Sequence, residues 1–163
     1  MLLYFLRHAD AATSGYANDF DRELTDEGKT EAEYVRRAIR GMKLSFTDVL
    51  CSPCVRARQT AKIVLGDFPA LKIEDCDCLT SSSDPANLFG KLSRYPGDGK
   101  ILLVTHEPFA SMSIASLLSG SSEPKISMKK ASVACIETRS PVQRRTGTLL
   151  WLLANEQMKL LLS

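Results

Sequence analysis

The stretch Leu2-Leu3-Tyr4-Phe5-Leu6-Arg7-His8 starts with five apolar residues and ends in an arginine and a histidine. A short apolar run that stops at polar residues is typical of a buried strand in a parallel sheet. Two later runs, Asp48–Cys51 and Ile101–Thr105, have the same form. Each of the three is followed by polar or proline residues and then by apolar residues at helical spacing, which predicts successive βα units.

The segment between the first two runs predicts a helix over Thr25–Gly41. Thr25 is a favourable N-cap, apolar residues recur at helical spacing, and Gly41 ends the pattern. A second helix is expected from near Cys54 to Gly66, and Pro53 is tolerated at its entry. The remaining elements before the C-terminal part are a weaker strand and two helices, expected at Leu71–Asp75, Pro85–Tyr95 and Phe109–Leu118.

The C-terminal part changes from this alternation to two consecutive strands. Ala131–Glu137 and Thr148–Leu153 are strand-like, and the polar, basic stretch 138–147 between them fits a hairpin connection. No internal repeat or linker divides the chain. We therefore expect a single domain over residues 1–163, folded as a three-layer α/β/α sandwich with a mainly parallel central sheet.

The composition is that of an ordinary globular protein. Of its 163 residues, 44% are hydrophobic and 25% are charged. The formal net charge of +2, from 21 basic and 19 acidic residues, argues against the broad positive surface that nucleic-acid binding needs. The apolar N-terminal run is too short for a signal peptide or a membrane span. We expect a cytoplasmic protein with neither nucleic acid nor membrane as a partner.

The five cysteines are expected to be reduced thiols, because an odd number without a secretory signal does not suggest a disulfide framework. One alternative is zinc, since Cys51, Cys54, Cys76 and Cys78 have the spacing of two thiolate pairs. We disfavour it because Cys51 ends an apolar run, where a free cysteine is commonly a small buried residue. No metal is therefore expected.

The only two histidines of the chain, His8 and His106, each follow an apolar run directly. Because the carboxyl ends of parallel strands meet at one edge of a sheet, we expect both to lie in one crevice with Arg7 and Arg56. A neutral imidazole can attack phosphorus, and arginine binds phosphoryl oxygens with two parallel hydrogen bonds. These four residues therefore predict a phosphoryl-transfer site.

Four segments resemble the motifs of the histidine phosphatase superfamily, also called the phosphoglycerate mutase-like superfamily. Leu6-Arg7-His8-Ala9 resembles its R-H-G signature, and Leu24-Thr25-x-x-Gly28 resembles its helix start. The segment from Ser52 to Ala61 resembles S-x-x-x-R-A-x-Q-T-A, and Val104-Thr105-His106 resembles the second-histidine strand. They occur in the family's order between residues 2 and 108.

The resemblance implies roles for these residues. His8 would be the phosphorylated nucleophile, Arg7 and Arg56 would clamp the phosphate, and His106 would donate to the transferred group. Such electrostatic stabilisation needs no cofactor. One departure is Ala9, which stands where the family usually has glycine and adds a methyl group close to the expected phosphate.

The sequence offers several candidates for further contacts to phosphate and for the general acid. Ser52 and Arg22 are candidates for contacts to phosphate, although for Arg22 we favour the alternative of a solvated face. Asp10, directly after Ala9, is the candidate catalytic acid, and Glu107 is the next acidic residue near a histidine. Larger family members carry the acid on an insertion between the third and fourth strands, a region that is short here and holds Asp77 and Asp84.

The compact length resembles the SixA-type phosphohistidine phosphatases of the superfamily. A phosphoimidazole leaving group needs less protonation than an alkoxide, which suits a weakly equipped acid site. The sequence therefore predicts a phosphatase that removes phosphate from phosphohistidine on a protein. The alternatives are a phosphatase of small phosphomonoesters and a non-catalytic module that binds phosphate.

Overall fold

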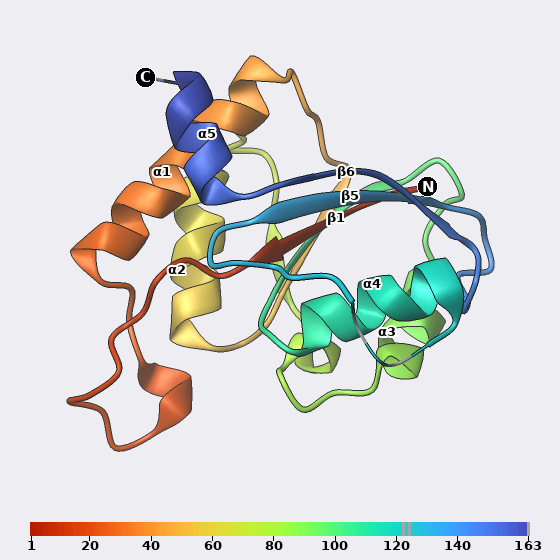
Figure 1. Cartoon of the computed structure of the whole chain (residues 1–163), viewed down its shortest axis with the longest axis horizontal. Coiled ribbons are helices and arrows are strands. Elements are labelled where there is room, and N and C mark those ends of the chain that lie inside the picture. Colours follow the sequence, from red (N-terminus) through yellow and green to blue (C-terminus); the bar gives the residue numbers. More distant parts are fainter. Residues whose placement is uncertain (122, 124, 163) are drawn as a thin grey trace.

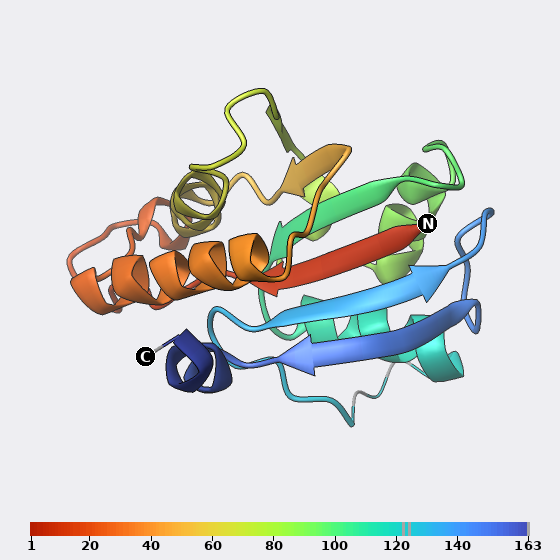
Figure 2. The same ribbon diagram turned by 90° about the horizontal axis from the view of Figure 1, so that it is seen from above.

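The computed structural model describes residues 1–121, 123 and 125–162. At its centre is a six-stranded sheet in the order β3-β2-β4-β1-β5-β6 (Figure 2). The strands are β1 Leu2–Arg7, β2 Asp48–Cys51, β3 Ile73–Asp75, β4 Lys100–Thr105, β5 Val133–Thr138 and β6 Gly147–Leu153.

The sheet is mainly parallel, as predicted. β1 pairs in parallel with β4, β4 with β2, and β2 with β3. The C-terminal hairpin adds two antiparallel strands, because β5 pairs antiparallel with both β1 and β6. The carboxyl ends of β1, β2 and β4 therefore lie at one edge of the sheet.

Helices cover both faces of the sheet, which makes the three layers (Figures 1 and 2). The helices are α1 Asp26–Gly41, α2 Val55–Val64, α3 Pro85–Leu92, α4 Phe109–Ser119 and α5 Asn155–Leu162, with short 3₁₀ helices η1 Asp19–Asp21 and η2 Asp77–Leu79. α1, α2 and α5 pack on one face, and α3 and α4 on the other. The predicted α/β/α sandwich is confirmed.

The alternation of side chains along β1 produces the two cores. Leu3 and Phe5 point to the face covered by α3 and α4, whereas Tyr4 and Leu6 point to the face covered by α1, α2 and α5. All four side chains are buried. A strand buried on both faces must be apolar at every position, which is why β1 has no polar residue before Arg7.

The structure differs from the prediction mainly near the C-terminus. Residues 155–162 form helix α5, which the sequence pattern did not indicate. Only Met158 of this helix is buried, so its apolar periodicity is too weak to identify from the sequence. The other predicted bounds shift by a few residues: β3 begins at Ile73, and α3 ends at Leu92. Within the described residues, no helix is long and apolar enough to cross a membrane.

The loop after β1 is held against the start of α1. Thr25 caps α1 by accepting a hydrogen bond from the backbone N–H of Gly28 at 3.0 Å, and its hydroxyl donates to Asp10 at 2.7 Å. A Cβ at Gly28 would lie 2.0 Å from the backbone oxygen of Asp10. Only glycine allows this close approach, so the L-T-x-x-G motif positions the loop that follows His8.

Candidate active site

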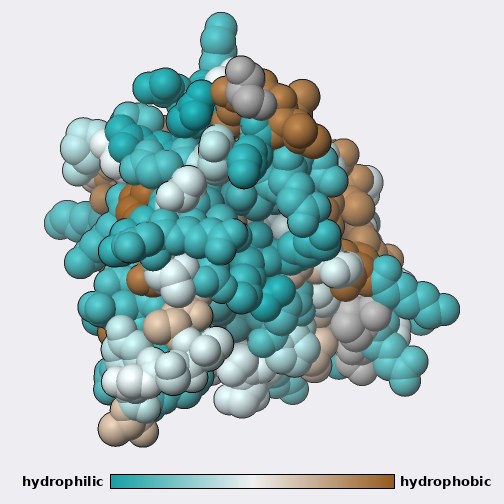
Figure 3. All heavy atoms as spheres, turned by 60° about the vertical axis from the view of Figure 1, so that its left-hand side comes forward, coloured by the Kyte–Doolittle hydropathy of each residue, from teal (hydrophilic) through white to brown (hydrophobic). Residues whose placement is uncertain are grey.

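A cavity of about 290 Å³ lies at the carboxyl ends of β1, β2 and β4. Its lining residues are Arg7, His8, Ala11, Thr13, Asp19, Arg22, Arg56, Ser81, His106, Glu107 and Lys130. Four of these side chains are cationic and two are carboxylates, so the cavity favours an anion. Figure 3, which turns this side of the molecule forward, shows a face covered mainly by hydrophilic residues.

His8 is held in one tautomer by the backbone. Its Nδ1 lies 2.7 Å from the oxygen of Ala9, which can only accept, so Nδ1 carries the proton. Nε2 is then left with a lone pair and faces Nε–H of Arg56 at 3.3 Å. Burial, followed by the charges of Arg56 and Arg7, lowers the pKa of His8 to about 4. The ring is therefore a neutral base at neutral pH.

His106 lies beside His8, with 4.9 Å between the ring centroids. Its Nε2 is 2.6 Å from the hydroxyl of Ser52, and its Nδ1 is buried without a hydrogen-bond partner. Burial, followed by the proximity of His8, lowers the pKa of His106 to about 3. If Ser52 donates to Nε2, the proton of this neutral ring is on Nδ1.

Arg7 is fixed by the connection between α4 and β5. Its Nη1 donates to the backbone oxygen of Met128 at 2.8 Å, while its Nε is buried without a partner. Buried donors without partners are rare in folded proteins. Two of the residues that carry such an atom, Arg7 and His106, line this one cavity.

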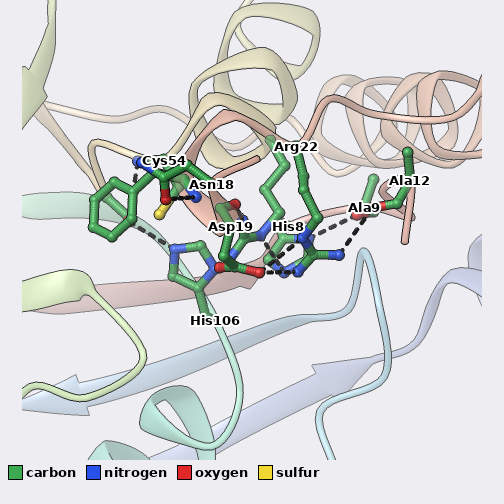
Figure 4. Close-up of polar contacts among 11 residues, drawn as sticks. His8, Ala9, Ala12, Asn18, Asp19, Arg22, Cys54 and His106 are labelled. Carbon is green, nitrogen blue, oxygen red and sulfur yellow. Dashed lines mark hydrogen bonds and ion pairs between the residues drawn. The ribbon is translucent and has the colours of Figure 1, made fainter. Parts of the chain in front are cut away.

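The guanidinium group of Arg56, which is only 4% exposed, contacts both His8 and Asp19. Nη1 donates to the backbone oxygen of Asp19 at 2.6 Å, and Nη2 donates to its carboxylate at 2.9 Å. Arg22 donates to the other carboxylate oxygen of Asp19, at 2.8 Å from Nε and 2.7 Å from Nη2. The carboxylate of Asp19 thus bridges two of the predicted phosphate-binding arginines, and Figure 4 shows Asp19 beside Arg22.

Sequence reasoning did not identify Asp19 as part of the site. It belongs to η1, within a loop closed at its base by the hydrogen bond from Ala12 N–H to the oxygen of Glu23. Burial opposes ionisation, but the hydrogen bonds from Arg56 and Arg22 lower the pKa of Asp19 overall. The only sequence signal was the Asp19-x-x-Arg22 spacing, which on a helical turn brings opposite charges together. Lys130, which also lines the cavity, was missed because it lies far along the chain.

Ala9 does not present its backbone N–H to the cavity. This group donates to the hydroxyl of Thr60 at 3.2 Å, and Thr60 donates to the backbone oxygen of Arg56 at 2.7 Å. The methyl group of Ala9 is completely buried. The methyl group in place of the family's glycine is therefore packed in the core, and Thr60 ties the His8 loop to the helix that carries Arg56.

Two predicted site residues do not line the cavity. Ser52 is completely buried and contacts His106 through its hydroxyl. The carboxylate of Asp10 accepts hydrogen bonds from Lys130 and Thr25. Both lower the pKa of this carboxyl group, and Lys130 has the larger effect. These two side chains support other groups of the site.

The other acid candidates differ in their distance from the site. Glu107 lines the cavity and accepts a hydrogen bond from Ser111 at 2.6 Å. Asp84 caps α3 by accepting from the N–H of Ala86, and neither it nor Asp77 lines the cavity. Of the four predicted candidates, only Glu107 is therefore in place to act on a bound ligand.

A second hollow of about 530 Å³ adjoins the first and shares Arg7 and Lys130 with it. It lies between α1 and α5. Its charged lining includes both signs: Glu27, Glu31 and Glu156, with Lys129, Lys130 and Lys159. A ligand larger than a phosphate could extend into this polar hollow.

The four cysteines of the zinc alternative do not assemble into a metal site. Among the residues described, no group of three or more His, Cys, Asp or Glu side chains is placed to hold a metal ion. All five cysteines are free thiols. The thiols of Cys76 and Cys78 contact each other, whereas the thiol of Cys51 donates a hydrogen bond to the backbone oxygen of Ser52.

Comparison with known proteins identifies the family. The sequence profile of the histidine phosphatase superfamily (branch 1) matches residues 3–80. Phosphohistidine phosphatase SixA of Escherichia coli K12 is 29% identical over 76% of this chain and 78% of its own. The chain belongs to the histidine phosphatase superfamily. An uncharacterised protein of Picosynechococcus sp. (strain PCC 7002) is 31% identical over 95% of this chain and 96% of its own.

A solved structure agrees with this assignment. The protein histidine phosphatase SixA in complex with tungstate superposes with a TM-score of 0.86 at 26% identity, covering 97% of this chain and 99% of that one. A protein of this superfamily with these relatives is a phosphatase. The cavity around His8 lies where the motifs that resemble the family's signature converge.

Proposed function

We propose that this phosphatase removes the phosphoryl group from phosphohistidine on a protein through a phosphohistidine intermediate on His8. In the first step, Nε2 of His8 attacks phosphorus, the P–N bond of the substrate breaks, and the leaving imidazole takes a proton. In the second step, water attacks phosphorus, the bond to His8 breaks, and phosphate leaves. Each step replaces one bond to phosphorus by another, so no redox partner is required.

The hydrogen bond from Nδ1 of His8 to the oxygen of Ala9 is the observation that carries this proposal. It leaves the lone pair on Nε2, where it faces Nε–H of Arg56, and burial keeps the ring unprotonated. A nucleophile must be a free base at the working pH, and His8 satisfies that condition. Arg56 contacts the same nitrogen, so a group bound at this guanidinium lies next to the attacking atom.

The donors around His8 fit a phosphoryl group. Nε of Arg7 and Nδ1 of His106 have no partner, and Arg56 and Arg22 are held by a carboxylate that an incoming anion can replace. Donors directed at the site of developing charge are usually the largest contribution to catalysis. The similar SixA structure is a complex with tungstate, an oxyanion like phosphate, which supports an oxyanion as the ligand of this chain.

Two features favour a phosphorylated protein as substrate. The polar hollow beside the site provides space for chain flanking the phosphorylated side chain. Of the predicted acid candidates, only Glu107 lines the cavity, and the labile P–N bond makes a modest demand on an acid. Similarity to a phosphohistidine phosphatase supports this choice.

The five free cysteines are in keeping with the reducing cytoplasm, where we propose that the protein acts.

Rapid quenching with labelled phosphohistidine protein tests the proposal. We expect acid-labile, base-stable label on His8 in the natural protein and none in His8→Ala. His106→Ala keeps the nucleophile and should still become labelled, more slowly, so it serves as the matched control. Label on another residue, or full turnover by His8→Ala, would refute the covalent role of His8.

A comparison of kcat/KM for a phosphohistidine protein, a phosphorylated sugar and phosphoglycerate tests the substrate class, because this ratio measures differential transition-state binding. We expect the protein substrate to be preferred. A clear preference for a small phosphomonoester would assign the alternative substrate class. Stoichiometric binding of phosphate without turnover of any substrate would indicate a binding module.

A further inference from the structure

Cys76 and Cys78 form a close thiol pair outside the catalytic cavity. Their Sγ atoms are 2.7 Å apart, compared with about 2.05 Å in a disulfide bond. Cys76 follows β3 and is only 3% exposed, whereas Cys78 lies in η2 and is partly exposed. Neither residue takes part in the proposed phosphoryl transfer. A pair this close can be joined by a local rearrangement of the turn that carries it.

We propose that Cys76 and Cys78 are a modification site at which hydrogen peroxide forms a disulfide that lowers phosphatase activity. This inference goes beyond the proposed function, and the formation of the bond does not depend on it. Disulfides in cytoplasmic proteins are usually transient and redox-sensing, and such a role suits this pair.

The chemistry of the pair proceeds in two balanced steps. The thiolate of Cys76 takes one oxygen from peroxide, giving a sulfenic acid, and hydroxide leaves with a proton as water. The sulfur of Cys78 then attacks Sγ of Cys76, the S–S bond forms, and the hydroxyl group leaves with the thiol proton of Cys78 as a second water. Two thiols are oxidised to one disulfide, and one peroxide is reduced to two waters.

The surroundings distinguish Cys76 from Cys51 and Cys135. The hydrogen bond from Cys78, followed by the charge of Lys91, lowers the pKa of Cys76 to about 7 despite its burial. Burial raises the pKa of Cys51 to about 12 and also raises that of Cys135. Because the thiolate is the reactive form, Cys51 and Cys135 are expected to be inert.

The segment that carries the pair is hydrogen-bonded to the ends of β2 and β4, two of the strands that lead into the active site. The N–H of Cys76 donates to the oxygen of Cys51 at 2.8 Å, next to Ser52, which contacts His106. The oxygen of Leu79 accepts a 2.6 Å hydrogen bond from the hydroxyl of Thr105, the residue before His106. Three residues beyond Cys78, Ser81 lines the cavity.

This connection gives the direction of the effect. Drawing the two sulfur atoms together twists the first turn of η2, which displaces the oxygen of Leu79 and the side chain of Ser81. Both changes disturb the position of His106 and the wall of the cavity. We therefore expect oxidation to reduce kcat several-fold, and a thiol reductant to restore it.

Peptide mapping by mass spectrometry after peroxide treatment tests the modification without any substrate. We expect the natural protein to lose two hydrogen atoms in the peptide that contains Cys76 and Cys78. Cys78→Ser and Cys76→Ala should not form the bond, whereas Cys135→Ser, which removes a buried cysteine on β5, should form it normally. Oxidation to sulfinic acid only, or a disulfide that uses Cys51 or Cys54, would overturn the assignment.

The activity of the same samples tests the consequence. Peroxide should slow the natural protein and Cys135→Ser, and it should leave Cys78→Ser at its untreated rate. Full activity of a quantitatively oxidised protein would overturn the inhibitory effect. If the reduced protein has no phosphatase activity on any substrate, the proposed function fails, while the mass measurement still decides whether the disulfide forms.

Discussion

The backbone oxygen and the carboxylate of Asp19 both accept hydrogen bonds from the guanidinium group of Arg56, at 2.6 and 2.9 Å. The same carboxylate is paired with Arg22 at 2.7 Å. An acidic side chain thus holds the donors that we assign to the phosphoryl group. A bound anion and this carboxylate compete for the same two arginines.

Removing the charge of Asp19 should therefore tighten the binding of inorganic phosphate or vanadate. In Asp19→Asn, the anion no longer displaces a carboxylate from Arg56 and Arg22. Because the Asp19 side chain is 62% exposed, the effect is that of a surface ion pair, about 1 kcal/mol or about fivefold in the inhibition constant. Asp21→Asn, in the same 3₁₀ helix, is the matched control. Weaker inhibition of Asp19→Asn would show that Asp19 organises the arginines more than it competes with the anion.

Both imidazoles should remain neutral far below the ordinary histidine range. Burial lowers the pKa of His8 to about 4 and that of His106 to about 3. Since the chain has only two histidines, NMR titration of the ring protons can follow both, with His8→Gln giving the assignment. A midpoint near 6.5 for either ring would contradict its burial as a neutral base.

The same shifts predict how the stability depends on pH. Histidines of the unfolded chain bind protons near pH 6.5, whereas the folded protein does not bind them until the pH approaches 4. The unfolded state therefore holds more protons between these values, so the free energy of unfolding should fall as the pH is lowered from 7 to 5. Urea denaturation at both pH values measures the change. The His8→Gln variant should show a smaller decrease, and an equal decrease would assign the effect to other groups.

Arg56→Lys should lose roughly 100-fold in kcat/KM. An ammonium group cannot contact Nε2 of His8 and bind an anion with a planar pair of donors, and hydrogen bonds to charged groups contribute about 1.5–3 kcal/mol. Arg58→Lys, two residues along α2, is the control, because Arg58 is an exposed residue paired with Asp75. Similar losses in the two variants would indicate a general effect on α2.

Loss of a single carboxylate should affect phosphohistidine turnover only modestly. We expect Glu107→Gln and Asp10→Asn to reduce kcat/KM by less than about tenfold, below the effect of a typical general acid. His8→Ala should abolish turnover. With a phosphomonoester, whose alkoxide needs a proton, Glu107→Gln should be more harmful than with phosphohistidine. A large, equal loss on both substrates would show that Glu107 binds the phosphoryl group.

Thr60→Val should destabilise the fold by about 1–3 kcal/mol. The hydroxyl of Thr60 is the partner of the buried N–H of Ala9, and valine would leave that donor unsatisfied. Thr30→Val is the control, because the Thr30 hydroxyl also donates to the carbonyl oxygen four residues earlier but is exposed. Urea midpoints of the two variants should differ clearly. Equal midpoints would mean that the N–H of Ala9 finds another acceptor.

The sequence by itself determined the architecture and the main reactive groups. β1 is buried on both faces, so its apolar run could be identified without tertiary information, and His8 follows directly from where that run ends. The same argument placed His106 after β4. Thr25 and Gly28 act locally, through a helix cap and a close backbone approach, and local chemistry of this kind is encoded in short motifs.

Only the tertiary structure decided which further residues contact the reactive groups and which tautomer of His8 is held. Asp19 reaches Arg56 across 37 positions of the chain, and Lys130 reaches Asp10 across 120. Contacts between polar residues so far apart in the chain leave no periodic pattern in the sequence. The tautomer of His8 also depends on its own folded loop, because Nδ1 is protonated only where the oxygen of Ala9 is turned toward it. The position of the proposed nucleophile can be predicted from a strand end, but its protonation and partners follow from packing.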